Sequence, residues 1–399
     1  MHFKKFNYIL TFMRRYYIQT FGCEMNKADS EKINMVLLQS WLQKTNDFKN
    51  ADLVIFNTCS VRQKWEDRVF WMMREIRFEN KQREKDWKTK IIAWITGCMV
   101  RKTGLNISYL EADKKRETAK EIEYIKNESW IFNNDDKLFP RIENLDFTLR
   151  IEEVKYLPFI LTHIYKEKIG SDDKFDDYLK QEQLRENKFS SSVIIQTWCD
   201  NFCTFCIVPY TRGREISREH DDIISEIKKL ASEWTKEISL VGQNVNSYWK
   251  QKNSKLWNEE KSSWNEWIWV SPFRKLLDDI NKIEGIDRIR FTSSNPHDMT
   301  EDILNAHFEL DKTCNYLHFA LQSGNDEMLK KMNRRHNYAD FKKMVEYLRS
   351  KDPFFSISTD IIVGYSGETD DMFQDTLNAI KELEIRSEER RVGKECRSR

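Results

Sequence analysis

Short apolar runs alternate with stretches of helical periodicity in the first third of the chain. Three runs, YYIQTFGC, ADLVIFNTC and KIIAWITGC, end at Cys23, Cys59 and Cys98. The stretches KADSEKINMVLLQSWLQK and VRQKWEDRVFWMMREIR lie between them and carry apolar residues at helical spacing. Continuous apolar runs of this length that alternate with helices are typical of parallel strands covered on both faces. We therefore predict a parallel α/β domain over residues 15–140.

A second α/β region begins at FSSSVIIQTWC and continues through alternating strand and helix patterns. This alternation predicts an incomplete (β/α) barrel over residues 191–385. Residues 141–190 form a connecting segment that contains a polar linker. The block 251–270 is polar and rich in tryptophan, which indicates a surface insertion. The tail 386–399 has no periodicity and does not continue the pattern.

The three cysteines of the first domain are 36 and 39 residues apart, so no local motif links them. Each nevertheless stands where a predicted strand ends. The carboxyl ends of parallel strands meet at one edge of a sheet, and open α/β sheets bind ligands there. We therefore expect the three thiols at one edge. The alternative is that they are small core residues at strand ends.

Three further cysteines lie within eight residues, as Cys199-x-x-x-Cys203-x-x-Cys206. This spacing can ligate three irons of a [4Fe–4S] cluster and leaves the fourth iron open. Structural zinc needs four protein ligands, and three thiols cannot all pair as disulfides. No apolar run reaches the roughly 18 residues of a membrane span, and a cytoplasmic location is expected. The net charge of +1 means that any RNA site rests on local basic clusters.

These motifs resemble a known family. The CxxxCxxC motif followed by IVPYTRGRE resembles the signature of radical S-adenosylmethionine enzymes. The settings GCEMNKADSE, NTCSVRQK and TGCMVR resemble the amino-terminal domain of the methylthiotransferases. The segments LVGQNVNSY, RFTSSNPHDM, QSGNDEMLKKMNRRH and DIIVGYSGET are most similar to the tRNA-2-methylthio-N6-dimethylallyladenosine synthases.

The resemblance implies radical chemistry on tRNA. Two [4Fe–4S] clusters and S-adenosylmethionine are the implied cofactors. A 5′-deoxyadenosyl radical removes hydrogen from carbon 2 of a prenylated adenosine beside the anticodon. Sulfur is then inserted, and a second S-adenosylmethionine supplies the methyl group. The implied partners are that tRNA and an electron donor such as flavodoxin or ferredoxin, for a monomer in the cytoplasm.

The resemblance also assigns roles to individual positions. The radical cluster takes Cys199, Cys203 and Cys206, and the auxiliary cluster takes Cys23, Cys59 and Cys98. The cofactor-binding positions by resemblance are Phe205, Gly242, Gln243, Gln322, Ser323, Asp360 and Gly364. The basic runs after the cluster loop and near residue 335 are expected to contact substrate. Their members are Arg212, Arg214, Arg334 and Arg335.

Two features depart from the family. Its members carry a further barrel portion and a small carboxy-terminal β-domain, so we expect this chain to be truncated. Glycine is scarce and tryptophan plentiful: 11 Gly and 13 Trp sum to 24 of 399 residues, about 6%, close to ordinary glycine usage alone. Trp198 stands where the family has glycine, and further tryptophans replace small residues at positions 65, 71, 94 and 249. We hypothesise that a stop codon recoded as glycine has been translated as tryptophan in this sequence.

Two alternative functions stay open at this point. The first is a methylthiotransferase that acts on a ribosomal protein or on another tRNA adenosine. The second is a non-enzymatic iron–sulfur protein that binds RNA. Cleavage of S-adenosylmethionine separates an enzyme from the second alternative.

Overall fold

The computed structural model describes residues 14–60, 63–100, 141–143, 145–170, 178–185, 187–212, 214–249 and 270–385. The chain divides into two compact units. The first comprises residues 1–186 and 210–214, and the second comprises residues 187–209 and 215–399. The predicted tail 386–399 and the predicted insertion, except for its last residue, lie outside the described residues.

A five-stranded sheet forms the centre of the first unit. Its order is β2-β1-β3-β4-β5, and all pairs are parallel. The strands are β1 (Arg15–Thr20), β2 (Gln43–Lys44), β3 (Leu53–Thr58), β4 (Ile92–Gly97) and β5 (Phe147–Thr148). Every residue of β3 and β4 is buried. Burial on both faces explains why these strands read as continuous apolar runs, and the predicted parallel α/β fold is confirmed.

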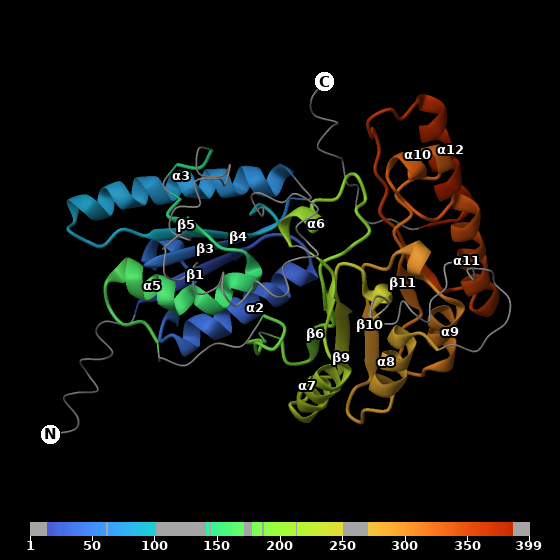
Figure 1. Ribbon diagram of the computed structural model, residues 1–399, viewed down its shortest axis with the longest axis horizontal. Coiled ribbons are helices and arrows are strands. Elements are labelled where there is room, and N and C mark those ends of the chain that lie inside the picture. Colours follow the sequence, from blue (N-terminus) through green and yellow to red (C-terminus); the bar gives the residue numbers. More distant parts are fainter. Residues whose placement is uncertain are drawn as a thin grey trace. The chain divides into compact units, whose positions relative to one another are not determined.

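Helices cover both faces of this sheet. In Figure 1, α3 (Gln63–Lys85) lies along one side, and α2 (Glu24–Gln39) lies with α5 (Leu157–Tyr165) along the other. Short 3₁₀ turns occur at η1 (Phe48–Asn50) and η4 (Ile151–Tyr156). The apolar face of α3 packs on alternate residues of the strands, for example Val69 with Val54 and Phe56 in one core cluster. Its exposed face is charged, so hydrophobic burial orients the helix.

The second unit has a row of parallel strands, as expected for part of a (β/α) barrel. β6 (Ser190–Ile194), β9 (Glu237–Val241) and β10 (Arg288–Phe291) form one sheet in the order β10-β9-β6. β11 (Tyr316–His318) pairs in parallel with β12 (Ser356–Ser358). A parallel bridge between Ser294 and Phe319 connects the two groups. β7 (Gln196–Thr197) and β8 (Ile216–Ser217) form a small antiparallel pair.

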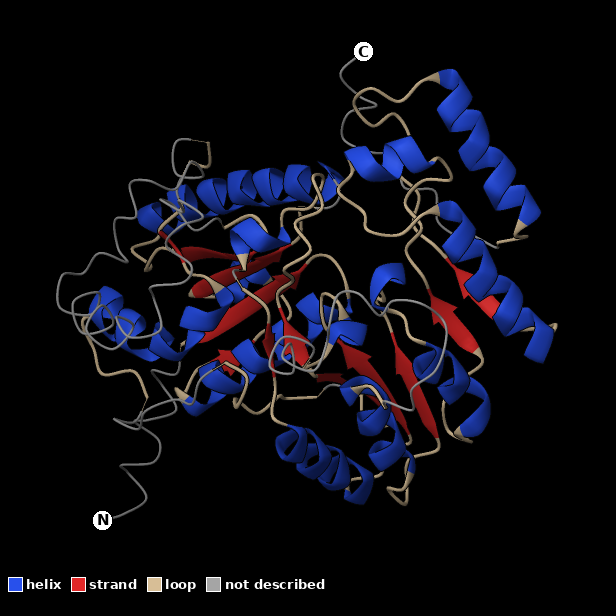
Figure 2. Cartoon of the chain, turned by 45° about the vertical axis from the view of Figure 1, so that its right-hand side comes forward, coloured by secondary structure: helices blue, strands red, loops and turns tan. Residues whose placement is uncertain are grey.

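Helices alternate with these strands, and Figure 2 shows them along the outer side of the row. Asparagine, serine or threonine side chains cap the first turns of α8, α10, α11 and α12, which satisfies backbone N–H groups there. No helix in the described ranges combines the length and apolar composition needed to cross a membrane. The helices and 3₁₀ turns are α6 (Val208–Thr211), α7 (His220–Ser232), η5 (Val245–Ser247), α8 (Pro272–Asn281), η7 (Pro296–Asp298), α9 (Glu301–Glu309), α10 (Asp326–Lys331), α11 (Tyr338–Lys351) and α12 (Asp370–Glu382).

Three helices end in the same way, with a tryptophan in left-handed backbone. After α2, α3 and α7, the residues Trp41, Trp87 and Trp234 have φ of 66°, 56° and 72°. The backbone N–H of each tryptophan donates to the carbonyl oxygen three residues earlier. The N–H of the following residue donates to the carbonyl oxygen five residues before it, as in Leu42 N to Leu37 O at 3.0 Å. This pair of bonds is the Schellman motif, whose left-handed position is usually glycine.

Candidate functional site

The three cysteines of the first unit follow three neighbouring strands. Cys23 precedes the first turn of α2 after β1, Cys59 follows β3, and Cys98 follows β4. In the sheet order these strands are adjacent, and the reversal between β1 and β3 is the switch point where such sheets bind ligands. Cys59 and Cys98 are buried, and Cys23 is exposed. The sheet order thus brings the predicted auxiliary ligands to one edge.

Polar side chains fasten α2 to this edge. Asn26 Nδ2 donates to Thr58 O at 2.8 Å, and Asn57 Nδ2 donates to Asn26 O at 2.7 Å. The thiol of Cys23 donates to Asn26 Oδ1 at 3.5 Å. These amides hold two cysteine-bearing segments in register. Our sequence reasoning missed both asparagines, although an asparagine inside the apolar run LVIFNT was a usable signal.

Two glycines allow backbone segments to pack closely at this edge of the sheet. Gly22 has φ of 119°, and a Cβ there would lie 2.6 Å from Cys59 Cβ and 3.2 Å from Cys59 Sγ. Gly97 has φ of 86°, and a Cβ there would lie 2.4 Å from Thr58 O. Both approaches are too close for any side chain. The close packing of these backbone segments around Cys59 and Thr58 therefore requires glycine at both positions.

We expect G97A to lower the free energy of unfolding by about 3 kcal/mol, because left-handed strain adds to a backbone clash. G367A is the matched control. Gly367 has a similar φ of 84°, but the nearest atom to its Cβ would be Lys331 Nζ at 3.6 Å. That variant should lose only about 1 kcal/mol, from strain alone. Urea unfolding measures both, and equal losses would contradict the steric argument.

A hydrogen bond and a nearby positive charge favour the ionised form of the Cys98 thiol. The pKa of Cys98 is lowered to about 6, chiefly by a hydrogen bond from Cys59 and also by the Arg212 guanidinium, against the effect of burial. Burial raises the pKa of Cys23. A thiolate is the form that ligates a metal. The edge therefore offers one thiol that is readily ionised at neutral pH.

Arg212, expected to contact substrate, is instead buried in the first unit. Its Nη2 lies 2.6 Å from Asp29 Oδ2, and both side chains are almost fully buried. Tyr178 donates its hydroxyl to the other oxygen of Asp29. This location favours a structural or site-supporting role over phosphate contact. Arg214 is exposed, as a substrate contact requires.

In the second unit the loop from Cys199 to Cys206 follows β7. Cys206 N donates to Cys203 O at 2.9 Å, which turns the loop between the last two cysteines. Asn201 Nδ2 donates to Cys199 Sγ at 3.4 Å. Burial raises the pKa of Cys199 to about 12, and the neighbouring cysteines add to this. A coordinated cation would reverse that shift, because a metal-bound thiol loses its proton.

The donor set of each cysteine group fits an iron–sulfur cluster, which prefers thiolate ligands. Within the described ranges, no three His, Cys, Asp or Glu side chains already surround a common point as bound ligands would. Each group nevertheless supplies three thiols, and in the second unit Asn201 Nδ2 donates to the sulfur of Cys199.

Two predicted cofactor positions adjoin the cluster loop. Gln243 accepts a hydrogen bond from the backbone N–H of Trp198, the residue before the first cysteine. A Cβ on Gly242 would lie 3.1 Å from Gln196 O, so the turn passes close to β7. Phe205 is 37% exposed beside Cys206, which leaves its ring accessible to a planar ligand.

The remaining predicted cofactor positions lie beyond β11 and β12. Gln322 N donates to Asp360 O at 2.9 Å, and Gln322 has φ of 74°. Ser323 is fully buried, and its Oγ lies 3.2 Å from Thr376 Oγ1, which suits packing under α12. Gly364, with φ of 73°, donates its N–H to the Glu368 carboxylate.

Glu215 is a functional candidate that the sequence did not single out, although it ends the RGRE motif. It accepts from Ser247 Oγ at 2.9 Å, and its N–H donates to Asp200 Oδ1 at 3.1 Å. Burial raises its pKa from 4.5 to about 8. Its carboxyl therefore holds a proton at neutral pH beside the cluster loop.

The raised pKa of Glu215 predicts that the stability of the folded chain depends on pH. The folded chain binds this proton more tightly than the unfolded chain, so stability falls as pH rises from 4.5 to about 8. E215Q lacks this titration. We expect the melting temperature of the wild-type apoprotein, relative to E215Q, to fall between about pH 5 and pH 8 and then level off. A difference that is constant with pH would contradict the assignment.

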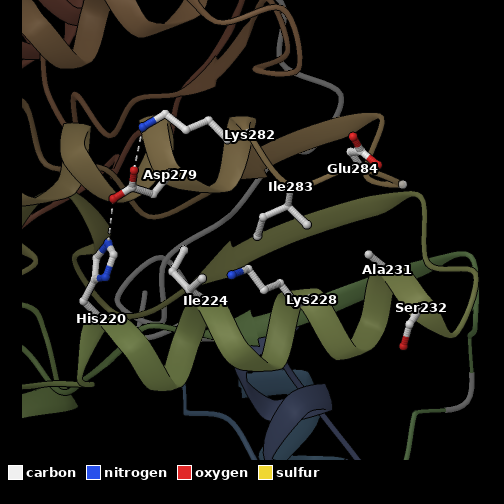
Figure 3. A pocket seen from close by; sticks show the side chains of 10 residues that line it. His220, Ile224, Lys228, Ala231, Ser232, Asp279, Lys282, Ile283 and Glu284 are labelled. Carbon is white, nitrogen blue, oxygen red and sulfur yellow. Dashed lines mark hydrogen bonds and ion pairs between the residues drawn. The ribbon is translucent and has the colours of Figure 1, made fainter.

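A surface groove of about 810 Å³ lies between α7 and α8. Figure 3 shows Asp279 between His220 and Lys282, with Lys282 Nζ 2.8 Å and His220 Nε2 3.3 Å from its oxygens. None of the predicted site residues lines this groove. We therefore assign it no part in the chemistry.

Two known protein families match this chain, one in each of the two units. The family described as "Radical SAM superfamily" matches residues 193–380, and "Uncharacterized protein family UPF0004" matches residues 15–116. The chain is thus a radical S-adenosylmethionine enzyme, a class that uses a [4Fe–4S] cluster and S-adenosylmethionine. Membership of an enzyme class excludes the alternative of a non-enzymatic iron–sulfur protein that binds RNA.

Proteins of similar sequence indicate which family within this class the chain belongs to. A protein of Clostridium botulinum (strain Okra / Type B1), named tRNA-2-methylthio-N(6)-dimethylallyladenosine synthase, is 35% identical over 379 residues, which cover 93% of this chain and 73% of the relative. A protein of the same name from Caldicellulosiruptor saccharolyticus is 35% identical and covers 94% of this chain and 70% of the relative. This chain belongs to the family of these synthases.

Solved structures agree at the level of the fold. The radical S-adenosylmethionine methyltransferase TsrM from Kitasatospora setae has a TM-score of 0.50 at 14% identity, over 93% of this chain and 71% of that one. The cobalamin-dependent radical enzyme OxsB has a TM-score of 0.55 at 10% identity, over 94% and 52%. At these identities the likeness concerns architecture alone.

Proposed function

We propose that this chain transfers a methylthio group to carbon 2 of N6-dimethylallyladenosine next to the anticodon of tRNA. The observation that carries the proposal is the presence of two separate three-cysteine groups, one in each unit. A radical enzyme with one cluster needs only the CxxxCxxC group. Relatives that carry this synthase name match both units.

In this proposal the two groups of cysteines have different roles. Cys199, Cys203 and Cys206 would hold the [4Fe–4S] cluster that binds and reductively cleaves S-adenosylmethionine. Cys23, Cys59 and Cys98 would hold a second cluster that takes part in sulfur donation. The turn at Gly242 and Gln243 and the strand ends at Asp360 and Gly364 would position the cofactor, while exposed Arg214 and Arg335 would contact the tRNA backbone.

The net reaction replaces one hydrogen on carbon 2 by sulfur and a methyl group. One S-adenosylmethionine is cleaved with one electron to methionine and 5′-deoxyadenosine, which carries the hydrogen away. The sulfur would come from the second cluster as sulfide, and the electron released when carbon 2 bonds to it would return to that cluster. A second S-adenosylmethionine would donate its methyl group to this sulfur and leave as S-adenosylhomocysteine. The electron requires a donor such as flavodoxin or ferredoxin. The protein's part is to align the adenosine and exclude water from the reacting groups. We infer a monomer in the cytoplasm.

The test uses hypomodified tRNA whose adenosine beside the anticodon is prenylated. The full chain is reconstituted anaerobically and supplied with S-adenosylmethionine and a reductant. Nucleoside mass spectrometry should show a mass gain of one methylthio group on the prenylated adenosine. Unprenylated tRNA is the control and should stay unchanged. Cluster loading and cofactor cleavage without this product would instead favour another tRNA adenosine or a ribosomal protein as substrate.

A further inference from the structure

The end of α10 is hydrogen-bonded to the loop that carries the cluster cysteines of the second unit. Four hydrogen bonds join the segment 331–333 to the segment 201–204. They run from Thr204 N to Met332 O at 3.2 Å, from Thr204 Oγ1 to Lys331 O at 3.0 Å, and from Asn333 Nδ2 to Asn201 O at 3.2 Å and Phe202 O at 3.0 Å.

Backbone conformation shows that this contact holds the loop firmly. Phe202 and Asn333 both have left-handed backbone, with φ of 48° and 55°. Asparagine tolerates this conformation, but phenylalanine adopts it rarely. A strained residue persists only where its surroundings over-determine it, and such residues concentrate at functional sites. Asn333 provides that constraint through its bond to Phe202 O.

The next residue, Arg334, reaches a cluster cysteine directly. Its Nη1 donates to Cys203 Sγ at 3.5 Å, and its Nη2 donates to Ala320 O at 2.9 Å. Nε of the same side chain is buried and has no hydrogen-bond partner among the described residues. The guanidinium is thus held by β11's carboxyl end and aimed at the sulfur of Cys203.

We propose that Arg334 is a positioning residue for the radical cluster and not a contact to substrate. It orients Cys203 and places a positive charge and an N–H donor on its sulfur. Both stabilise the more negative, reduced cluster and so raise its reduction potential. The proposal rests on the proposed function only in requiring a [4Fe–4S] cluster on this loop.

The test compares neighbouring arginines in the full chain with Cys23, Cys59 and Cys98 replaced by alanine, so that one cluster remains. R334Q should lower the midpoint potential of this cluster in a redox titration followed by electron paramagnetic resonance. R335Q, the matched control on an exposed neighbour, should leave the potential unchanged and weaken tRNA binding. A fully loaded R334Q with the parent potential would overturn the proposal.

A variant that retains no iron does not end the test. R334M is then measured, because methionine fills much of the same space but carries neither the charge nor an N–H donor. A potential below that of the parent supports the proposal, and an unchanged potential overturns it. Failure of the parent chain itself to bind any cluster would refute the proposed function, so the two failures are distinguishable.

An independent observation concerns the tryptophans. Five of the eight tryptophans in the described ranges have positive φ. They are Trp41, Trp87, Trp198, Trp234 and Trp249, with φ between 56° and 72°. In this region a Cβ crowds the backbone, and glycine is the residue that enters it without cost.

Packing does not compensate for this conformation at the helix ends. Trp41, Trp87 and Trp234 are 55%, 97% and 80% exposed. Trp198 stands directly before Cys199, and its indole Nε1 is buried without a hydrogen-bond partner among the described residues. The exposed indoles at the helix ends and the unpaired Nε1 of Trp198 give no local reason for tryptophan, whereas Trp249 Nε1 donates to Arg218 O at 2.9 Å. The backbone at all five positions suits glycine.

We infer that the protein made in its native cell carries glycine at these five positions, because one stop codon is read there as glycine. The same cause accounts for the low glycine and high tryptophan counts. The test is mass spectrometry of peptides from the protein isolated from its own cells, together with the gene sequence. Glycine at all five positions is expected, and tryptophan at any of them would overturn the inference.

Discussion

Replacing Trp41 and Trp87 together by glycine is expected to raise the free energy of unfolding by about 2 kcal/mol, about 1 kcal/mol for each position. The gain comes from relieving left-handed strain in two Schellman motifs, and glycine's greater freedom in the unfolded chain reduces it. Both indoles are largely exposed, so little packing is lost. The two sites lie at the ends of different helices, which favours additivity. Urea denaturation of the W41G/W87G variant measures the effect.

Trp71 provides the matched control because the same chemical change should have the opposite sign there. It is 57% exposed but lies inside α3 in helical backbone. Glycine in a helix interior costs about 1 kcal/mol. W71G should therefore destabilise the chain while W87G stabilises it. If both variants lose stability, left-handed strain is not what distinguishes these tryptophans.

Removing each cysteine group is expected to separate two steps of the reaction. Replacing Cys199, Cys203 and Cys206 by alanine should abolish cleavage of S-adenosylmethionine to 5′-deoxyadenosine, because the cofactor loses its open iron. Replacing the cysteines of the first unit should leave that cleavage measurable and abolish the methylthio product. Chromatography of 5′-deoxyadenosine and nucleoside mass spectrometry provide the two measurements.

Iron content adds a check that does not depend on turnover. Either triple variant should retain about half of the iron bound by the reconstituted parent, as expected for two clusters of equal size. C314A is the control, since Cys314 belongs to neither group, and it should keep all of the iron. Full iron content after loss of Cys23, Cys59 and Cys98 would show that these thiols hold no cluster.

Much of the fold could be predicted from apolar runs. β3 and β4 are buried along their whole length, and such strands leave a continuous apolar signature. The parallel fold also implied that residues at strand ends share an edge. The neighbour relation of β1, β3 and β4, which brings the cysteines near one another, depends on pairing between distant segments, and local patterns do not record it.

The roles of the arginines could not be read from local sequence. A run of basic residues usually marks a solvated surface, and this predicted substrate contact for Arg212 and Arg334. The partner of Arg212 is Asp29, 183 positions away, and the partner of Arg334 is Cys203, 131 positions away. Whether a charge is buried depends on such partners. Neighbouring Arg214 and Arg335 have the same local setting and are exposed.

The order of the strands in the first unit has a consequence for how that unit is held together. A metal centre on Cys23, Cys59 and Cys98 would close two successive chain loops of 36 and 39 residues across three strands. Closing loops before folding removes conformational entropy from the unfolded chain. The centre would then act as a reversible crosslink, and iron chelation would loosen β1, β3 and β4 as one cooperative block.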